Sequence, residues 1–342
     1  MELSPRKLAI IEAIVKDFIL TGTPIGSRTL SKKYVQGLSS ATLRNEMSDL
    51  EEMGYLEQPH TSAGRIPSDK AYRLYVDHLM QVPELSAEEA AYLRGTYHRR
   101  ADEVEQVIRQ AARVISDTTS YTSMVLAPQV ETALLQHVQL VPVGVGVAMV
   151  ILVTDIGVHK DAVIRVPDDM TADDLYEISR MMTARLCGRP VSMVPAVLAS
   201  EMGREFIKNR MLFERLIQGV EERNDHPENE VVLGGTTNLF NYPEYSDIEK
   251  AKALISVLEN KDLLHRMLHD ATKLEFTVTI GGENKEEAIK DCSVVTATYR
   301  IGGHSLGSIG VIGPTRMQYS KVLAVLSFMG RTMSNLLEDS ER

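Results

Sequence analysis

The sequence predicts an α+β protein of several domains, in which a small helical head precedes a mixed α/β body. A chain of 342 residues is long enough for about two or three domains of ~100–200 residues each. Helical periodicity fills the first part of the chain and ends in a short hairpin pattern. Further along, strands give way to a mainly helical stretch and then resume, which is the order expected of an insertion into an α+β domain.

The charge distribution separates the head from the body. The net charge is −10, yet residues 1–80 contain ten Lys or Arg and ten Asp or Glu, so the whole excess of acid lies beyond residue 80. Residues 18–45 and the segment 58–68 contain no Asp or Glu at all. Because a nearby carboxylate weakens phosphate attraction, this pattern favours a local nucleic-acid contact on an otherwise acidic protein.

Two helices open the predicted head. The first follows Ser4-Pro5, an N-cap with proline at the first helical position, and ends at the turn 21–24. Its apolar residues recur at helical spacing. A short second helix follows Ser27, with Lys32 and Lys33 on its outer face.

The third helix, which Ser39-Ser40 cap and which runs to about Met53, has the division expected of a recognition helix. Leu43, Met47 and Leu50 lie at spacing i, i+4, i+7 and form a buried stripe. The opposite face of its first turns presents short polar groups and one arginine, which suit base edges in a major groove. The candidate contacts here are Ser39, Ser40, Thr42, Arg44 and Asn45.

A wing follows the third helix. Gly54 ends the helix, a strand begins at Tyr55, and the segment 58–65 forms a loop, with Arg65 expected at its tip, before Ile66-Pro67 returns. An arginine at a wing tip suits a minor groove or phosphate. Residues of this loop and cations of the second helix are together the candidates for contact with the DNA backbone or minor groove. They are Arg28, Lys32, Lys33, His60, Thr61 and Arg65. A three-helix domain with a hairpin also serves as a protein–protein module, but the absence of acid favours DNA.

Predicted helices and strands alternate along the body. Helical patterns cover 69–80, 86–117, 171–186, 199–222, 247–258 and 319–337, and strands cover 134–141, 145–154, 158–166, 274–280, 293–300 and 305–312. We therefore expect a head over 1–80, connecting helices over 81–120, an α/β domain formed by 121–190 and 271–342, and an inserted, mainly helical domain over 191–270.

Four segments closely resemble the family of the bacterial heat-inducible transcription repressor HrcA. They are Leu38–Met47 with Leu50–Leu56, Gln58–Pro67, Gly234–Phe240 and Val294–Lys321. The resemblance spans nearly the whole chain. It implies a homodimeric repressor that binds an inverted-repeat DNA operator of chaperone operons and is relieved on heat stress. It also implies a GAF-like body domain with an inserted dimerisation domain, and a GroE chaperonin partner.

Other functions have weaker support in the sequence. The Gly303–Gly307 segment has the letters of a nucleophile elbow, but a strand follows it instead of a helix. His265 and His269 have metal-compatible spacing without further clustered ligands. We expect no enzyme activity, no cofactor, no metal, free cysteines at 187 and 292, no membrane segment and a cytoplasmic location. Two alternatives stay open: a regulator gated by a small molecule in the GAF-like domain, and a protein scaffold.

Overall fold

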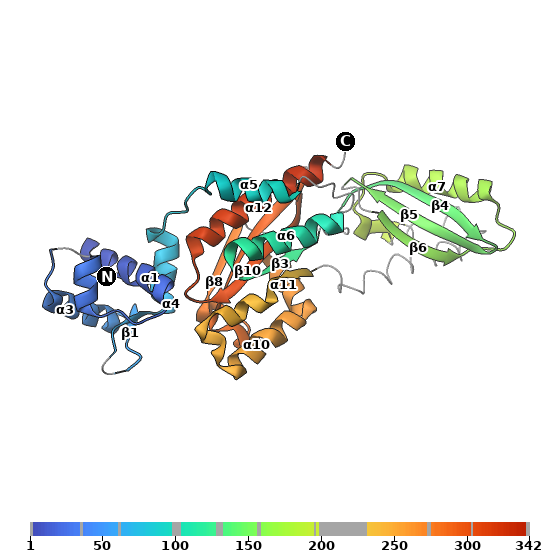
Figure 1. The fold of residues 1–342 in the computed structure, drawn as a ribbon. Coiled ribbons are helices and arrows are strands. Elements are labelled where there is room, and N and C mark those ends of the chain that lie inside the picture. The colour runs from blue at the N-terminus through green and yellow to red at the C-terminus, as the bar shows by residue number, and fades with distance from the viewer. Residues whose placement is uncertain are drawn as a thin grey trace.

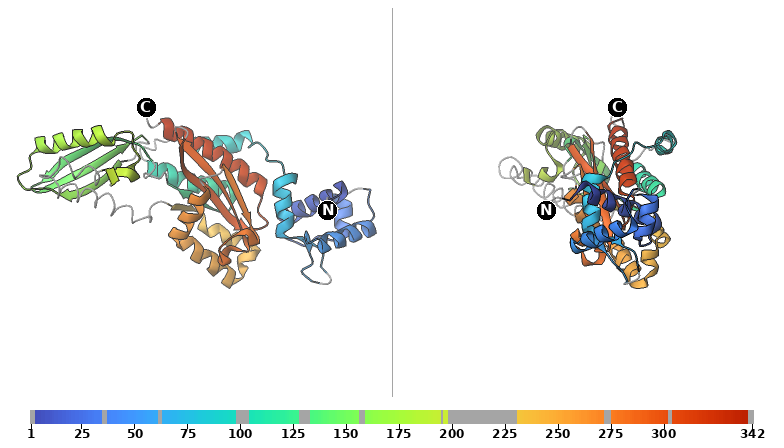
Figure 2. Two further views of the ribbon diagram at one scale, coloured as in Figure 1. Left: turned by 180° about the vertical axis from the view of Figure 1, so that it is seen from behind. Right: turned by 90° about the vertical axis from the view of Figure 1, so that its left-hand side faces the viewer.

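Three parts follow one another along an elongated molecule in the computed structural model (Figure 1). The structure describes residues 3–34, 37–60, 63–97, 104–127, 133–155, 159–194, 196–197, 231–271, 275–301 and 304–339. A helical head holds the N-terminus, a sheet covered by helices forms the centre, and a smaller sheet with one helix lies at the far end. The view from behind in Figure 2 shows the same order. The expected helix over 199–222 lies outside the described residues.

The head contains three helices and a two-stranded hairpin, in the expected order. Their bounds are α1 Pro5–Thr21, α2 Ser27–Lys33, α3 Ser40–Glu52, β1 Leu56–Glu57 and β2 Ile66–Pro67. Ser4 caps α1 and Gly22 ends it with a φ of 62°, a left-handed conformation that glycine adopts without strain. Apolar residues from all three helices are buried together, in a cluster that continues through Tyr72 into the body.

A helical segment joins the head to the body. It consists of α4 Asp69–Leu74, the π-helical turn η1 Tyr75–Leu79 and, after an extended stretch, α5 Ala87–Tyr97. The predicted single helix over 86–117 is observed as α5 and α6 Val104–Thr119, with residues between them outside the description.

The body is built on a five-stranded antiparallel sheet with the order β7-β3-β10-β9-β8. The strands are β3 Thr122–Leu126, β7 Val231–Gly234, β8 Phe276–Ile280, β9 Cys292–Ile301 and β10 His304–Pro314. Short 3-10 turns connect the strands and helices on one side: η4 Thr236–Asn241, η5 Pro243–Ser246, η6 Gly281–Glu283 and η7 Glu287–Ile289.

Helices cover both faces of this sheet (Figure 1). Along β9, Val295 and Tyr299 belong to the core under α6 and α12 Tyr319–Asp339. Val294 belongs to the core under α10 Ile248–Glu259 and α11 Lys261–Ala271. Successive residues of a strand point to opposite faces, so a strand buried on both sides reads as a continuous apolar run.

The far part of the molecule is a three-stranded antiparallel sheet with one helix. Its strands β4 Leu135–Gly144, β5 Val147–Thr154 and β6 His159–Arg165 pair in chain order, and α7 Ala172–Leu186 packs on them, followed by the short turn η2 Val191–Met193. These elements bury a separate apolar cluster of their own. A capping box opens α7, with Thr171 and Asp174 bonded to each other's backbone amides. We call residues 133–197 the distal module.

The strand pairing divides the chain differently from the boundaries expected at 190 and 270. The distal module, which the sequence assigned to the main α/β domain, shares no sheet with it. Conversely, β7, α10 and α11, which were assigned to the insertion, pack into the main sheet and its core. The reason is that β3 pairs with β7, which is over 100 residues later in the chain, and local periodicity carries no information on such a partner.

Polar and aromatic contacts fix the head against the body. The Arg73 Nε donates to Glu283 Oε1 at 2.8 Å, and a second guanidinium nitrogen contacts Glu283 Oε2 and the carbonyl of Val278. The amide of Gly282 donates to Asp69 Oδ2 at 2.8 Å. The rings of Tyr72 and Tyr319 lie 6.0 Å apart, joining the apolar cores of the two parts.

A second arginine bridges the two parts from the body side. Arg316 forms a two-point ion pair with Glu244 and donates to the carbonyl of Ile19 at 3.4 Å, close to the C-terminal end of α1.

Within the described part of the chain, no helix is long and apolar enough to cross a bilayer.

Candidate nucleic-acid interface

The N-terminal end of α3 presents the predicted polar face to solvent. Ser39 caps the helix, because its Oγ accepts from the amide of Thr42 at 3.1 Å and lies 2.9 Å from the Thr42 hydroxyl. Arg44 and Asn45 are exposed, whereas Ser40 and Thr42 are half-buried. Ser39 and Thr42 thus hold the start of the helix in place, and Arg44 and Asn45 are the side chains free to reach a partner.

The acidic residues of α3 are neutralised on its other side. Lys7 Nζ lies 3.0 Å from Glu46 Oε2 and 2.6 Å from Asp49 Oδ2, and Arg6 lies 3.4 Å from Glu46. The hydrogen bond to Asp49 is the main cause that raises the pKa of Lys7. Cations of α1 therefore offset two carboxylates that would otherwise repel phosphate near the exposed face.

The two lysines at the end of α2 differ in their surroundings. Both are exposed, but Lys33 Nζ lies 3.2 Å from Asp17 Oδ1, a side chain that is only 5% exposed. The same carboxylate accepts a hydrogen bond of 2.8 Å from the Tyr34 hydroxyl, which raises the pKa of Tyr34. Spacing along the chain could not indicate this pair, because Asp17 and Lys33 lie on different helices. Lys32 is the less constrained of the two cations.

Arg65 lies at the base of the hairpin and not at its tip, contrary to the sequence prediction. Its backbone pairs with that of Ile25 through two hydrogen bonds of 2.9 and 3.0 Å. Its side chain is 18% exposed and contacts Glu51 Oε2 at 2.7 Å, and its Nε is buried without a hydrogen-bond partner. His60, nearer the tip, is exposed, and Thr61 lies outside the described residues. Arg65 and Ile25 form an isolated antiparallel β-bridge, and the spacing along the chain could not show this pairing.

Gly64 makes that pairing possible. A Cβ atom built on Gly64 would lie 2.3 Å from the carbonyl oxygen of Ile25 and 2.9 Å from the amide of Gly26. Both contacts are with backbone, which cannot move aside independently. The hairpin can therefore lie against the loop before α2 only with glycine at this position.

A hollow of about 540 Å³ lies between α2, α3 and the hairpin. Arg28 from α2, Arg44 from α3 and Arg65 from the hairpin all line it, and its described lining contains no Asp or Glu. The remaining lining residues are Gly26, Ser27, Met47, Gln58, Ala63 and Gly64. The structure thus brings together three of the predicted contact residues. Ser40, Asn45, Lys32, Lys33 and His60 do not line the hollow.

Ser27 and Gln58 are lining residues that the sequence reasoning did not select. Gln58 Nε2 donates to the carbonyl of Ala63 at 3.1 Å, across the hairpin loop. Its position in the acid-free segment 58–68 could have indicated Gln58 as a candidate contact from the sequence. Ser27 could have been suggested by its place directly before Arg28 at the start of α2.

The candidate enzyme and metal motifs occupy ordinary positions. Ser305 lies in β10, which pairs antiparallel with β9, so the segment is a strand-to-strand connection and lacks the strand-to-helix turn of a nucleophile elbow. The rings of His265 and His269 are stacked 5.9 Å apart on α11. Among the described residues, no group of three or more His, Cys, Asp or Glu is arranged to hold a metal ion.

Comparisons with known proteins agree along the whole chain. Residues 105–323 match the family model of the HrcA protein C terminal domain. The heat-inducible transcription repressor HrcA of Pelotomaculum thermopropionicum is 44% identical over 340 residues, which cover 99% of this chain and 98% of that protein. The repressor of the same name from Ruminiclostridium cellulolyticum is 45% identical over 338 residues, 96% of each chain.

A solved structure shares the fold. The crystal structure of a hypothetical protein at 2.2 Å resolution superposes with a TM-score of 0.64 at 21% sequence identity, covering 99% of this chain and 100% of that one. At this identity the likeness concerns the arrangement of helices and strands only.

Proposed function

Since the chain belongs to the HrcA family of heat-inducible transcription repressors, we propose that it represses transcription by binding an inverted-repeat operator through its N-terminal head. The observation that carries this proposal is the hollow lined by Arg28, Arg44 and Arg65. Three guanidinium groups from three elements converge there on a protein whose net charge is −10. Arginine pairs with phosphate and with guanine edges in fixed geometry, so the hollow suits a DNA backbone beside a groove.

The head has the element order of a winged helix-turn-helix, with α3 as the helix that enters the major groove. In this arrangement Arg44 and Asn45 read base edges, and Arg28 and Lys32 contact phosphate. Arg65 holds the hairpin in position through Ile25 and Glu51 and presents its guanidinium to the hollow. The protein–protein module considered from the sequence gives no reason for three arginines at one concave surface.

We propose further that the protein acts as a homodimer, because one head reads only one half-site and specific operators require two. The distal module offers a surface for this contact. On the sheet face turned away from α7, Met149 of β5 pairs with Val163 of β6, and Val163 is 66% exposed. Val145, in the turn between β4 and β5, is 85% exposed. Exposed apolar side chains on one face of a sheet favour burial against a partner.

We propose that the inducing condition is heat, as the names of the relatives suggest, and that the regulated genes are chaperone operons, on the ground of the family resemblance. GroE chaperonin is a proposed partner on the ground of the family resemblance. A gel-shift titration on an inverted repeat, on a single half-site and on scrambled DNA, with and without chaperonin, tests these proposals together. Equal affinity for the three DNAs would contradict a sequence-specific repressor.

A further inference from the structure

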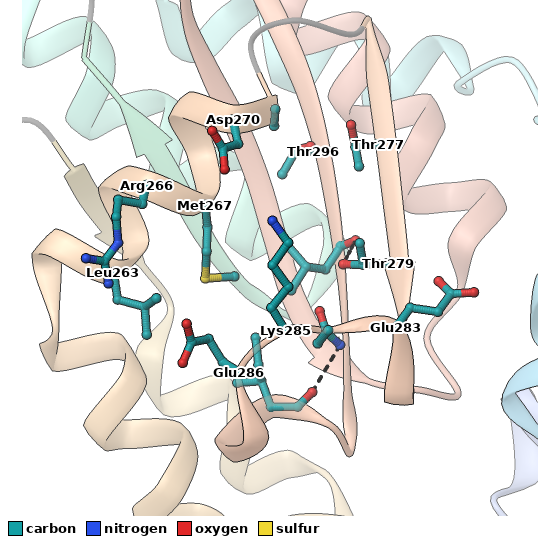
Figure 3. Close-up of a pocket in the computed structure, with 14 residues that line it drawn as sticks. Leu263, Arg266, Met267, Asp270, Thr277, Thr279, Glu283, Lys285, Glu286 and Thr296 are labelled. Carbon is teal, nitrogen blue, oxygen red and sulfur yellow. Dashed lines mark hydrogen bonds between the residues drawn. The ribbon is translucent and has the colours of Figure 1, made fainter.

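A cavity of about 460 Å³ lies in the body between α11 and the edge of the five-stranded sheet (Figure 3). Residues of β8 and β9 line one side, α11 lines the opposite side, and the segment 283–289 closes one end. The lining is largely apolar, with Leu263 and Met267 from α11 and Ile289 and Val294 facing them. A concave, mostly apolar site with a few polar groups is the usual form of a small-molecule site.

Two threonines in this lining have unpaired hydroxyl groups. Thr277 of β8 and Thr296 of β9 are direct cross-strand partners. The Oγ1 atoms of both are buried and have no hydrogen-bond partner, and Thr296 is 4% exposed. Thr279, two residues along the same strand, donates to the carbonyl of Val294 at 3.4 Å. Buried hydroxyls are costly without a partner, so a neighbouring pair of them points to a polar group that is supplied from outside the chain.

A cation lines the same cavity as the two threonines. In Figure 3 the Lys285 side chain reaches into the cavity, with its ammonium group directed toward the end where Thr296 and Asp270 lie. No carboxylate of the described residues lies within ion-pair distance of Lys285. The Glu283 carboxylate is already held by Arg73 and by the amide of Ile280. The ammonium group is thus available to an anion that enters the cavity.

We propose that this cavity binds a small organic carboxylic acid with an apolar body. The carboxylate pairs with Lys285, the hydroxyls of Thr277 and Thr296 bond its polar atoms, and the hydrocarbon part packs on Leu263 and Met267. An ammonium ligand would instead use Asp270 and Glu286, which also line the cavity, and the experiment below separates the two chemistries.

A residue that lines the cavity also contacts the head. Glu283 lines the cavity and pairs with Arg73 of α4, and the neighbouring Gly282 amide donates to Asp69 at 2.8 Å. An occupant therefore contacts the same segment that positions the head. By linkage, a ligand that prefers one head position changes operator affinity, and the operator changes ligand affinity by the same factor. This coupling rests on the proposed repressor function, whereas ligand binding itself does not.

Calorimetric titration of the full-length protein without DNA tests the site, with hexanoate as the probe and hexylamine and hexan-1-ol as matched controls. Hexanoate is expected to bind with a dissociation constant on the order of 1 mM, at least about tenfold more tightly than either control. Lys285→Met should remove this preference, and Lys252→Met, on the surface of α10, should leave it unchanged. Tighter binding of hexylamine, or no binding of hexanoate, overturns the proposal.

Thr296→Val provides a readout that does not depend on the probe. Because this substitution replaces an unpartnered buried hydroxyl by a methyl group of similar size, the melting temperature of the free protein should stay equal or rise while hexanoate binding falls about tenfold. A lower melting temperature would show that the hydroxyl has a partner within the protein and would overturn the ligand role. Hexanoate binding that leaves operator affinity unchanged overturns the coupling, and failure of the wild-type protein to bind operator overturns the repressor function alone.

Discussion

Arg73 and Glu283, 210 residues apart in the sequence, form a two-point ion pair that joins the head to the body, with Arg73 Nε 2.8 Å from Glu283 Oε1. The same guanidinium group donates to the carbonyl of Val278. One arginine of α4 therefore contacts both strand β8 and the turn that follows it. In the proposed dimer, the geometry of this junction sets how the two heads are spaced on DNA, since the proposed DNA-binding face belongs to the head.

Glu283→Gln should weaken the junction and make its stability less sensitive to acid. The hydrogen bonds from Arg73 are the main cause that lowers the pKa of Glu283, so this group stabilises the fold fully above its ordinary pKa and loses that contribution as pH falls through the lowered value. The pair is about one-third exposed, so the expected loss at pH 7 is about 1 kcal/mol or less. Urea unfolding of both proteins between pH 7 and pH 3 should show the difference vanishing in acid. Glu249→Gln on α10, which is 84% exposed, is the control and should behave as wild type.

Arg44→Ala should reduce operator affinity and relax sequence preference at one base position. Arg44 is exposed on the first turns of α3, and a lost arginine–guanine contact costs ~1–3 kcal/mol. Fluorescence anisotropy on operators substituted at each position measures both effects. A uniform loss of affinity for every DNA, including scrambled sequence, would assign Arg44 to a phosphate contact.

Lys32→Ala should lower the slope of log affinity against log salt concentration by about one unit, because each phosphate contact releases about one counterion. Lys33→Ala should also lower it, by less than Lys32→Ala, since the ion pair with Asp17 already offsets part of the Lys33 charge. Titrations from low to high salt give the slopes. Lys252→Ala, a cation on the body, is the matched control, and an unchanged slope in the Lys32/Lys33 double variant would remove α2 from the interface.

Gly64→Ala should detach the hairpin from the loop before α2. The added Cβ would lie 2.3 Å from the Ile25 carbonyl oxygen, so the backbone hydrogen bonds between Ile25 and Arg65 cannot form. We expect a destabilisation of about 1–3 kcal/mol and a larger loss of operator affinity, because Arg65 leaves the hollow. Gly26→Ala, in the same hollow, is the steric control: no atom lies within 4 Å of its Cβ position and its φ is −91°, so the hairpin should stay attached and the cost should be about 1 kcal/mol or less, the usual loss when alanine replaces glycine at a helix N-cap. Equal effects of the two substitutions would contradict this account of the hairpin.

Local signals in the sequence predicted the individual helices and strands. They could not predict which of these elements pair or pack with one another. Ser4 and Ser39 cap helices as expected, because a cap depends on residues within one turn. The apolar stripe of α3 is buried as predicted for the same reason. In contrast, the bridge between Ile25 and Arg65 joins residues 40 positions apart, and it places Arg65 at the base of the hairpin.

The candidate site shows the same limit. The acid-free windows, the polar start of the third helix and the expected wing selected Arg28, Arg44 and Arg65, and the structure places them around one hollow. The ion pairs of Lys33 with Asp17 and of Arg65 with Glu51 depend on how helices cross, so spacing along the chain could not show them. In the body, β3 pairs with β7, so the insertion is the segment between these two strands and not the expected segment 191–270.

Replacing residues 127–230 by an Asn-Gly turn should leave a folded, monomeric protein that binds half-sites only. Leu126 and Val231 are direct antiparallel partners at the ends of β3 and β7, so a two-residue turn of the hairpin type can join them. The distal module has its own apolar core, and its removal takes only Ala133 and the partly buried Ala127 from the two described cores of the main sheet. If the module forms the dimer, the shortened protein should sediment as a monomer and bind a single half-site and the inverted repeat with nearly equal, weak affinity. Removing 191–270 instead, the insertion expected from the sequence, should unfold the body, because it takes away β7, α10 and nearly all of α11. A shortened 127–230 variant that still sediments as a dimer and binds the inverted repeat tightly would place the interface on the head or the main sheet.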